Sequence, residues 1–188
     1  MRVEELSKLF PPGTPIPPIL RKLAERSEES EGLLSCDFEL TPDGESDSYY
    51  WFDGREAAAK QFRIFGFDGL HSLYGYWLYP GRTIADAPIV YLNGEGLENT
   101  VLANNLEEFL ALLTLGEEAV GLFNGWGESA DPCHGISEFR EWANKEFGIV
   151  PPPNPREIVD AARKSHPDLD AWIDRLIQEV PPRSAELN

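Results

Sequence analysis

The sequence is poor in cysteine. Its 188 residues contain two, Cys36 and Cys133, and no C-x-x-C pair. Two cysteines cannot build the disulfide framework of a small secreted domain. A reducing compartment is the simplest inference, because intracellular proteins keep their thiols reduced. Cys133 is therefore expected to be a loop thiol.

Long apolar runs are also absent. No run approaches the roughly 20 residues that a membrane-spanning helix needs. The first residues, Met1 to Glu5, lack the basic-then-apolar pattern of a secretory signal. Together with the cysteine usage, these absences predict a soluble cytoplasmic protein.

Positive charge is scarce. The chain has 16 Lys and Arg against 33 Asp and Glu, which gives a formal net charge of −17 and a sequence pI near 4.5. Such a field repels phosphate backbones and anionic lipid, so direct binding to nucleic acid or to a membrane is not expected. It would attract a basic protein partner and accelerate its approach. The alternative is that the acidity only keeps the protein soluble.

Common catalytic and cofactor motifs are missing as well. There is no G-x-S-x-G nucleophile turn. Gly94-x-Gly96 and Gly125-x-Gly127 are too short for a phosphate loop and lack its Lys-Ser/Thr pair, so we interpret both as turns. No cofactor is expected.

A metal site can be considered at Asp131, Cys133 and His134. Adjacent Cys and His side chains cannot easily close on one ion, and no second ligand pair lies at a finger-like spacing. No metal is expected there.

Paired carboxylates can be considered at Asp68, Glu95 and Glu98, which lie in turns. Two acids could serve hydrolysis. However, any acidic protein places acids in turns, so these positions do not predict a catalytic pair.

The central stretch from Gln61 to Leu115 predicts a sheet followed by a helix. Apolar and aromatic runs indicate four strands, separated by turn signals at Asp68-Gly69 and at residues 93–96. The strands are expected at Gln61–Phe67, Ser72–Tyr79, Pro88–Leu92 and Thr100–Ala103. Leu106, Phe109, Leu110 and Leu113 then lie on one helical face, with Asn104 or Asn105 as the cap.

The preceding residues predict further elements. Period-two alternation over Gly32–Leu40 indicates one half-buried strand. Thr41–Asp47 is expected to be an acidic loop, and Tyr49–Phe52 another strand or an aromatic anchor. Short helices are expected at Val3–Phe10 and after Pro17.

The C-terminal part is predicted to be helical. Residues 116–127 are interpreted as an irregular helix, Ser137 as a helix N-cap, and Gly148 as the C-terminal glycine of that helix. Asn154-Pro155 begins another helix, and Leu169 to Val180 gives the cleanest amphipathic pattern in the chain. A run of strands followed by a run of helices indicates an α+β protein.

The central unit also resembles a known family. The resemblance lies in Phe65-Gly66-Phe67-Asp68-Gly69, Leu73 to Leu78, Pro88 to Gly96 and Val101 to Leu110. In this order the motifs resemble the SUKH superfamily, the group related to yeast cell-wall synthesis regulators of the Smi/Knr type. The resemblance covers about residues 61–115. The chain has Leu70-His71-Ser72 where relatives often have more Gly.

The resemblance implies a mixed, mostly antiparallel sheet flanked by helices, within an α+β fold. It divides the chain into a SUKH-like core, residues 1–115, and a helical C-terminal extension, residues 116–188, packed on the same domain. Many bacterial members are thought to be immunity proteins that bind and neutralise toxins, often nucleases. No catalytic residue comes with that role.

Three hypotheses follow. The first is a non-catalytic immunity protein that binds a basic toxin domain; the second is a regulatory scaffold for an unrelated cellular protein. The third is an enzyme, which would need a cleft with paired acids or a perturbed His. A Tyr/Trp-rich strand face can be core or interface. The residues that we predict to contact a partner are Asp68, His71, Tyr74, Glu95, Glu28 and Glu29.

Overall fold

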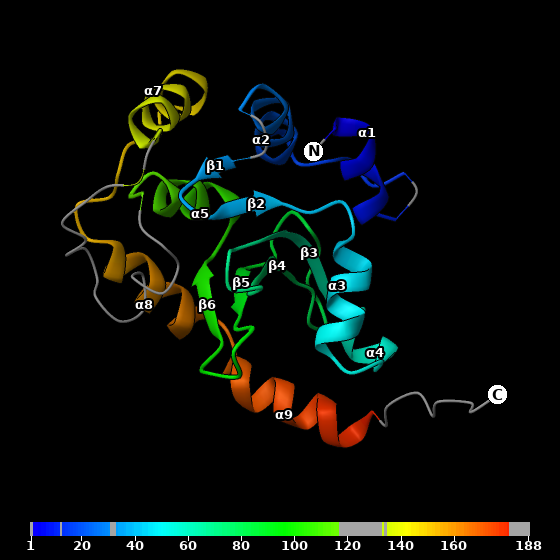
Figure 1. Ribbon diagram of the computed structural model, residues 1–188. Coiled ribbons are helices and arrows are strands. Elements are labelled where there is room, and N and C mark those ends of the chain that lie inside the picture. The colour runs from blue at the N-terminus through cyan, green and yellow to red at the C-terminus, as the bar shows by residue number, and fades with distance from the viewer. Residues whose placement is uncertain (1, 12, 31–32, 117–132, 134, 181–188) are drawn as a thin grey trace.

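The computed structural model describes residues 2–11, 13–30, 33–116, 133 and 135–180. A curled antiparallel sheet lies at its centre, with helices around it (Figure 1). The strands are β1 (Leu33–Ser35), β2 (Phe38–Leu40), β3 (Phe62–Phe67), β4 (Leu73–Trp77), β5 (Ile89–Leu92) and β6 (Thr100–Ala103). The helices are α1 (Val3–Leu6), α2 (Pro18–Glu29), α3 (Gly44–Trp51), α4 (Glu56–Ala59), α5 (Leu106–Leu113), α7 (Ile136–Phe147), α8 (Pro155–Ser165) and α9 (Leu169–Glu179), and a 3₁₀ turn, η1, spans Ser7–Leu9.

The six strands pair in chain order, β1-β2-β3-β4-β5-β6, and all five pairings are antiparallel. The prediction of an α+β protein with helices at its C-terminal end is confirmed, although α1 and α2 precede the first strand and α3 and α4 lie between β2 and β3. The four predicted strands between residues 61 and 103 all form, each within two residues of its predicted bounds. Because the strands are sequential neighbours, the turns after β3 and after β5 lie at the same end of the sheet. We call this end the turn end.

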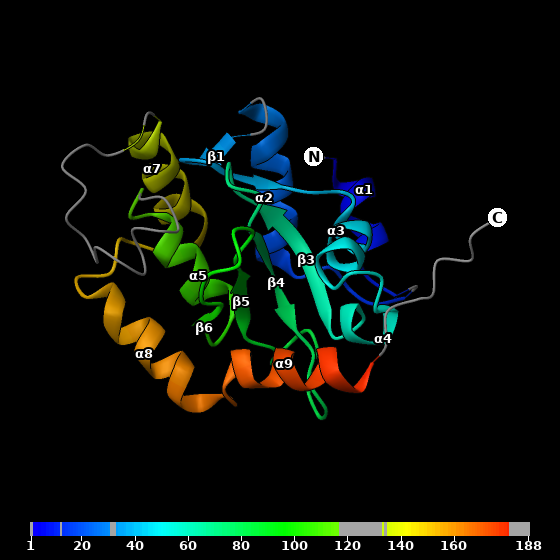
Figure 2. The same ribbon diagram turned by 60° about the horizontal axis from the view of Figure 1, so that its bottom comes forward.

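Each face of the sheet is covered by a separate hydrophobic core. On one face Phe65, Tyr74 and Tyr76 pack with side chains from α2, α5 and α7. On the other face Phe62 and Trp77 pack with side chains from α4 and α9. Figures 1 and 2 show α2, α5 and α7 on one side of the sheet and α9 on the other. The alternation follows from the period of two along β4.

This double covering decides between core and interface for the aromatic residues of β4. Tyr74, Tyr76 and Trp77 are each at most 2% exposed, so they belong to the cores. The sheet therefore offers no open aromatic face in these strands, and any contact with a partner must use its ends or the helices.

The C-terminal helices complete the cores. Val159 of α8 joins the first core, whereas Ala162 of α8 and Leu169, Ile173 and Leu176 of α9 join the second. Asp168 caps α9 by accepting a hydrogen bond from the Ala171 backbone N–H at 2.8 Å. None of the described helices is both long and apolar enough to cross a lipid bilayer.

The segment from residue 32 to residue 52 differs from the prediction. The expected single strand over Gly32–Leu40 is a hairpin, in which Cys36 adopts a left-handed φ of 51° and reverses the chain between β1 and β2. The expected loop and aromatic strand form α3 instead. Gly44 begins this helix against the carbonyl oxygen of Ile64, where no Cβ would fit. Contact with β3 thus outweighs the strand preference of the aromatic residues.

Two smaller predictions at helix ends have different outcomes. The N-cap of α7 is Gly135, so the assignment of Ser137 was wrong by two residues. Gly148 ends the helix in the left-handed region, with φ of 70°, as predicted. The irregular helix expected at 116–127 falls almost wholly on residues outside those described.

The expectation of a free thiol at Cys133 is also wrong. Cys36 and Cys133 form a disulfide, with their Cα atoms 5.2 Å apart and a separation of 97 in residue number. The hairpin reversal places Cys36 beside the segment that precedes α7, which sequence spacing could not reveal. The inference of a reducing compartment loses its support, because it rested on unpaired cysteines.

Candidate partner-binding surface

The first turn at the turn end is organised by Asp68. This carboxylate is 1% exposed. Its Oδ1 accepts hydrogen bonds from the backbone N–H groups of Leu70, at 3.0 Å, and Ser72, at 2.9 Å. Its Oδ2 accepts a longer bond from the Tyr74 hydroxyl at 3.4 Å. Burial, reinforced by the Asp68 carboxylate, raises the pKa of Tyr74 well above its usual value.

Two predicted contact residues are corrected by this geometry. Asp68 and Tyr74 are buried, and their polar groups bond to each other and to the turn backbone. They cannot contact a partner in this conformation. Their role is to fix the shape of the turn.

The second turn, at residues 93–97, is fixed in the same way by Asn93. The side-chain Oδ1 of Asn93 accepts from the backbone N–H groups of Glu95, at 2.8 Å, and Leu97, at 3.2 Å. The indole N–H of Trp51 donates to the Asn93 carbonyl at 3.3 Å, which ties α3 to this turn. In each turn two backbone N–H groups thus donate to a side chain of the same turn.

The two turns touch. A Cβ on Gly94 would lie 2.7 Å from the carbonyl oxygens of both Leu70 and His71, so only glycine permits this approach. The Ser72 hydroxyl accepts from the Gly94 N–H at 3.1 Å and bridges the turns again. The two turns therefore form one continuous surface.

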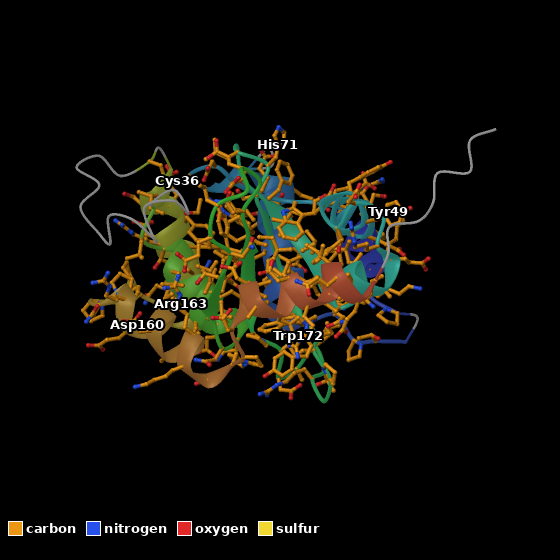
Figure 3. The ribbon with its side chains drawn as sticks, turned by 90° about the horizontal axis from the view of Figure 1, so that it is seen from below. Cys36, Tyr49, His71, Asp160, Arg163 and Trp172 are labelled. Carbon is orange, nitrogen blue, oxygen red and sulfur yellow. A yellow bond between two sulfur atoms is a disulfide. The ribbon has the colours of Figure 1, made fainter. Side chains whose placement is uncertain are left out.

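His71 and Glu95, which we predicted to contact a partner, are exposed at this surface. His71 has a left-handed φ of 59°, and its N–H donates to the Asp68 carbonyl at 3.0 Å. Figure 3 shows the His71 side chain at the extremity of the molecule, pointing away from the sheet.

Exposed apolar side chains gather here. The described residues include five large hydrophobic side chains that are exposed. Three belong to the turn end: Tyr50 at 78%, Leu70 at 42% and Leu97 at 65%. The other two, Val150 and Ile177, lie elsewhere. We define the turn surface as Tyr50, Leu70, His71, Glu95 and Leu97.

A cavity of about 330 Å³ opens beside His71. Its wall contains three aromatic side chains, from Tyr50, Trp51 and Phe67, and one carboxylate, from Asp47. The remaining lining residues are Thr41, His71 and Leu73.

The charge around the turn surface has one sign. Residues 27–54 contain nine Asp and Glu and no Lys or Arg, and residues 64–139 contain a single Lys or Arg, Arg82. Arg82 follows β4 and therefore lies at the opposite end of the sheet. Arg163 of α8 is held by Thr100, at 2.6 Å, and by Glu98, at 3.5 Å. The field at the turn surface is consequently negative.

The last two predicted contact residues, Glu28 and Glu29, lie at the end of α2. Both are exposed, as predicted, and Glu29 is 3.6 Å from Arg26. Glu28 borders a separate depression shared with α1. The structure therefore brings His71 and Glu95 together and leaves Glu28 and Glu29 outside this group.

Sequence reasoning missed Asp47, Tyr50, Trp51 and Leu97. The first three were missed because their segment was assigned as a loop and a strand. A helix signal was present, since Glu45 and Asp47 are acids in the first turn of α3.

The residues considered for chemistry differ in their surroundings. Asp68 is buried, whereas Glu95 and Glu98 are exposed on the next turn. Asp131 and His134 lie outside the described residues, and Cys133 is in the disulfide. Within the described ranges no three His, Cys, Asp or Glu side chains are grouped as metal ligands would be.

His166 has a perturbed environment. Its Nδ1 is 2.9 Å from the Tyr79 hydroxyl, and its Nε2 is 3.2 Å from Asn104 Oδ1. Burial, followed by the positive charge of Arg82, lowers the pKa of His166. Both ring nitrogens are engaged in joining the end of α8 to the sheet.

Comparisons with protein-family models, with curated proteins and with solved structures found no match to this chain.

Proposed function

We propose that this protein is a non-catalytic binding module that holds a basic protein on its turn surface. We further propose that it is an immunity protein of the SUKH type, whose partner is a toxin domain, most simply a nuclease. The observation that carries the proposal is the gathering of exposed apolar side chains on a rigid, acidic surface.

The rigidity of the turns supports binding. Backbone N–H groups in both turns donate to the side chains of Asp68, Ser72 and Asn93. A surface that is already ordered loses less conformational entropy on association than a flexible loop does. Tyr50 and Leu97 project from it as candidate anchors, and aromatic anchors often dominate binding energy.

The charge supports the choice of a basic partner. Electrostatic attraction between an acidic and a basic surface accelerates association, and repulsion weakens the binding of acidic competitors. Both effects decrease as the salt concentration increases. A nuclease domain must attract phosphate and is therefore often basic. The resemblance to SUKH proteins, which spans both turns, supports an immunity role in particular.

The cytoplasm remains the proposed compartment, since an immunity protein would meet its toxin inside the cell that makes both. The disulfide is unusual for that compartment. Measuring the redox state of Cys36 and Cys133 in rapidly alkylated cells would therefore test the location independently.

The test is growth rescue. The neighbouring candidate toxin gene is expressed with this chain or with the Leu97→Lys variant, which places a cation on the turn surface. We expect the natural chain to restore growth. We expect Leu97→Lys to weaken binding to the toxin at least ~10-fold, which is the loss of affinity that follows from removing an anchor residue of moderate energy. Val150→Lys is the matched control, because Val150 is 58% exposed and lies away from the turns.

The outcomes separate the two candidate functions. Rescue that Leu97→Lys abolishes and Val150→Lys preserves supports immunity through the turn surface. Failure of rescue, together with a salt-sensitive complex with another cellular protein, supports the regulatory scaffold. Equal effects of the two variants would exclude the turn surface as the contact.

A further inference from the structure

The cavity beside the turn surface contains a carboxylate without a cation. Asp47 is half-buried, and its Oδ2 accepts a hydrogen bond from the Thr41 hydroxyl at 2.8 Å. No Lys, Arg or His pairs with Asp47 among the described residues. Burial raises the pKa of Asp47; the hydrogen bond from Thr41 opposes this effect and the nearby Asp43 carboxylate adds to it.

The walls of the cavity are aromatic. Tyr50 is exposed at its rim, and Trp51 and Phe67 are half-buried within it. Trp51 cannot easily turn away, because its indole N–H is bonded to the Asn93 carbonyl. Ring faces carry negative potential and attract cations placed over them.

We propose that this cavity binds an arginine side chain of the partner, with the guanidinium on the aromatic wall and its N–H groups donating to the Asp47 carboxylate. The inference rests on the proposed partner-binding function and names the chemistry of one contact in it. It requires a partner with an exposed arginine opposite the turn surface.

Arginine fits this site better than lysine for two reasons. Its planar guanidinium can stack on a ring and still donate several hydrogen bonds in the ring plane. It is also more weakly hydrated than an ammonium group, so its entry into a partly apolar cavity costs less. The described residues that line the cavity include neither Lys nor Arg.

The test needs no partner protein. The full chain, labelled with ¹⁵N, is titrated with N-acetyl-arginine amide, N-acetyl-lysine amide and N-acetyl-citrulline amide, and the Trp51 indole N–H resonance is followed. We expect saturable shifts with the arginine compound, with a Kd in the millimolar range. Binding of the lysine compound should be several-fold weaker, and citrulline, which lacks the charge, should not bind.

Two variants locate the binding. Asp47→Asn keeps an acceptor for Thr41 and removes the charge, so arginine binding should be lost while the spectrum stays folded. Tyr50→Ala removes one aromatic wall at an exposed position and should weaken binding about 3-fold. Asp160→Asn is the matched control, since Asp160 is an exposed acid on α8 (Figure 3).

The outcomes are distinguishable from those of the proposed function. Equal shifts with arginine and lysine that survive Asp47→Asn would mean attraction to the acidic surface as a whole, and would overturn the arginine site. The absence of any saturable shift would overturn it too. In either case growth rescue could still succeed through other contacts of the turn surface. Conversely, selective arginine binding without growth rescue would support the arginine site and contradict the immunity role.

Discussion

The two ends of the sheet use charged groups in different ways. At the turn end the Asp68 carboxylate accepts hydrogen bonds from backbone N–H groups. Asp47 lines a cavity in which none of the described lining residues is Lys or Arg. Three apolar side chains, from Tyr50, Leu70 and Leu97, are exposed at this end.

At the opposite end, the loop of residues 79–86 satisfies its charges internally. Arg82 donates to the Tyr79 hydroxyl at 2.8 Å and lies 5.1 Å from the centre of that ring. It also approaches Asp86 at 3.5 Å. Figure 3 shows Trp172, whose ring packs near Tyr79, on the side of the molecule away from His71. We call this the Arg82 end.

The difference lies in whether each end contains every charged and aromatic group of its interaction. At the Arg82 end, cation, ring and carboxylate come from the same chain. At the turn end, the aromatic groups and the carboxylate are present, and among the described residues no Lys or Arg lines the cavity. A surface that lacks one component of an interaction is a better candidate for recognition than one that contains all of them.

The largest expected effect concerns the covalent support of the turn end. The disulfide fixes the β1–β2 reversal, which lies beside the first turn, since Gly69 approaches the Asp37 side chain. Reduction should lower the free energy of unfolding by about 3 kcal/mol, because it restores the freedom of a long loop to the unfolded chain. Urea denaturation with and without a dithiol measures this.

The double variant Cys36→Ser/Cys133→Ser is the control for that measurement. It should unfold like the reduced protein and show no response to the dithiol. If reduction leaves the urea midpoint unchanged, the disulfide does not support the turn end.

The next effect in size concerns Asp68. Asp68→Ala should cost about 2 kcal/mol of stability, because two backbone N–H groups and the Tyr74 hydroxyl lose their acceptor inside the protein. Glu95→Ala, on the exposed neighbouring turn, should change stability by less than about 0.5 kcal/mol. Similar losses in the two variants would contradict the internal role given to Asp68.

The smallest effect concerns the Arg82 end. The folded state lowers the pKa of His166, so the unfolded chain binds the proton more readily. Stability should therefore be unaffected by this group well above the unfolded pKa of about 6.5, and should fall as the pH drops below it. The folded-state causes are burial and Arg82, opposed by Glu108.

A His166→Gln variant tests that prediction. Its unfolding free energy should depend less on pH between about 7 and 5 than that of the natural chain, within the range where His titrates. An unchanged slope would show that other groups set the pH dependence. The His166→Gln substitution should leave binding at the turn surface unchanged. That outcome would support the contrast between the two ends of the sheet.

Much of the fold was predictable because its signals are local. The strands β3 to β6 were found from apolar runs between Gly- and Asp-containing turns, and α5, α8 and α9 from their helical periodicity and caps. Asn105 indeed caps α5 by accepting from the Glu108 N–H at 2.9 Å. Of the residues predicted to contact a partner, His71 and Glu95 are exposed at the turn end, whereas Asp68 and Tyr74 are buried.

The remaining features depended on contacts between distant residues. The β1–β2 reversal occurs at Cys36, which carries no turn signal of its own. The α3 helix forms where Gly44 lies against Ile64, although its aromatic residues favour strands. Asp68 resembles any acidic turn residue in the sequence, and only the folded chain shows that its carboxylate is turned inward.

The sequence by itself determined the α+β class, the order of the central strands, the acidity, and the places where the chain turns. These depend on periodicity, composition and residue conformational preference, which act over a few positions. The tertiary structure alone decided that both sheet faces are covered, that the cysteines pair, and that Asp47, Tyr50 and His71 share a cavity. Those outcomes depend on which distant surfaces exclude water together, and a local pattern does not contain that information.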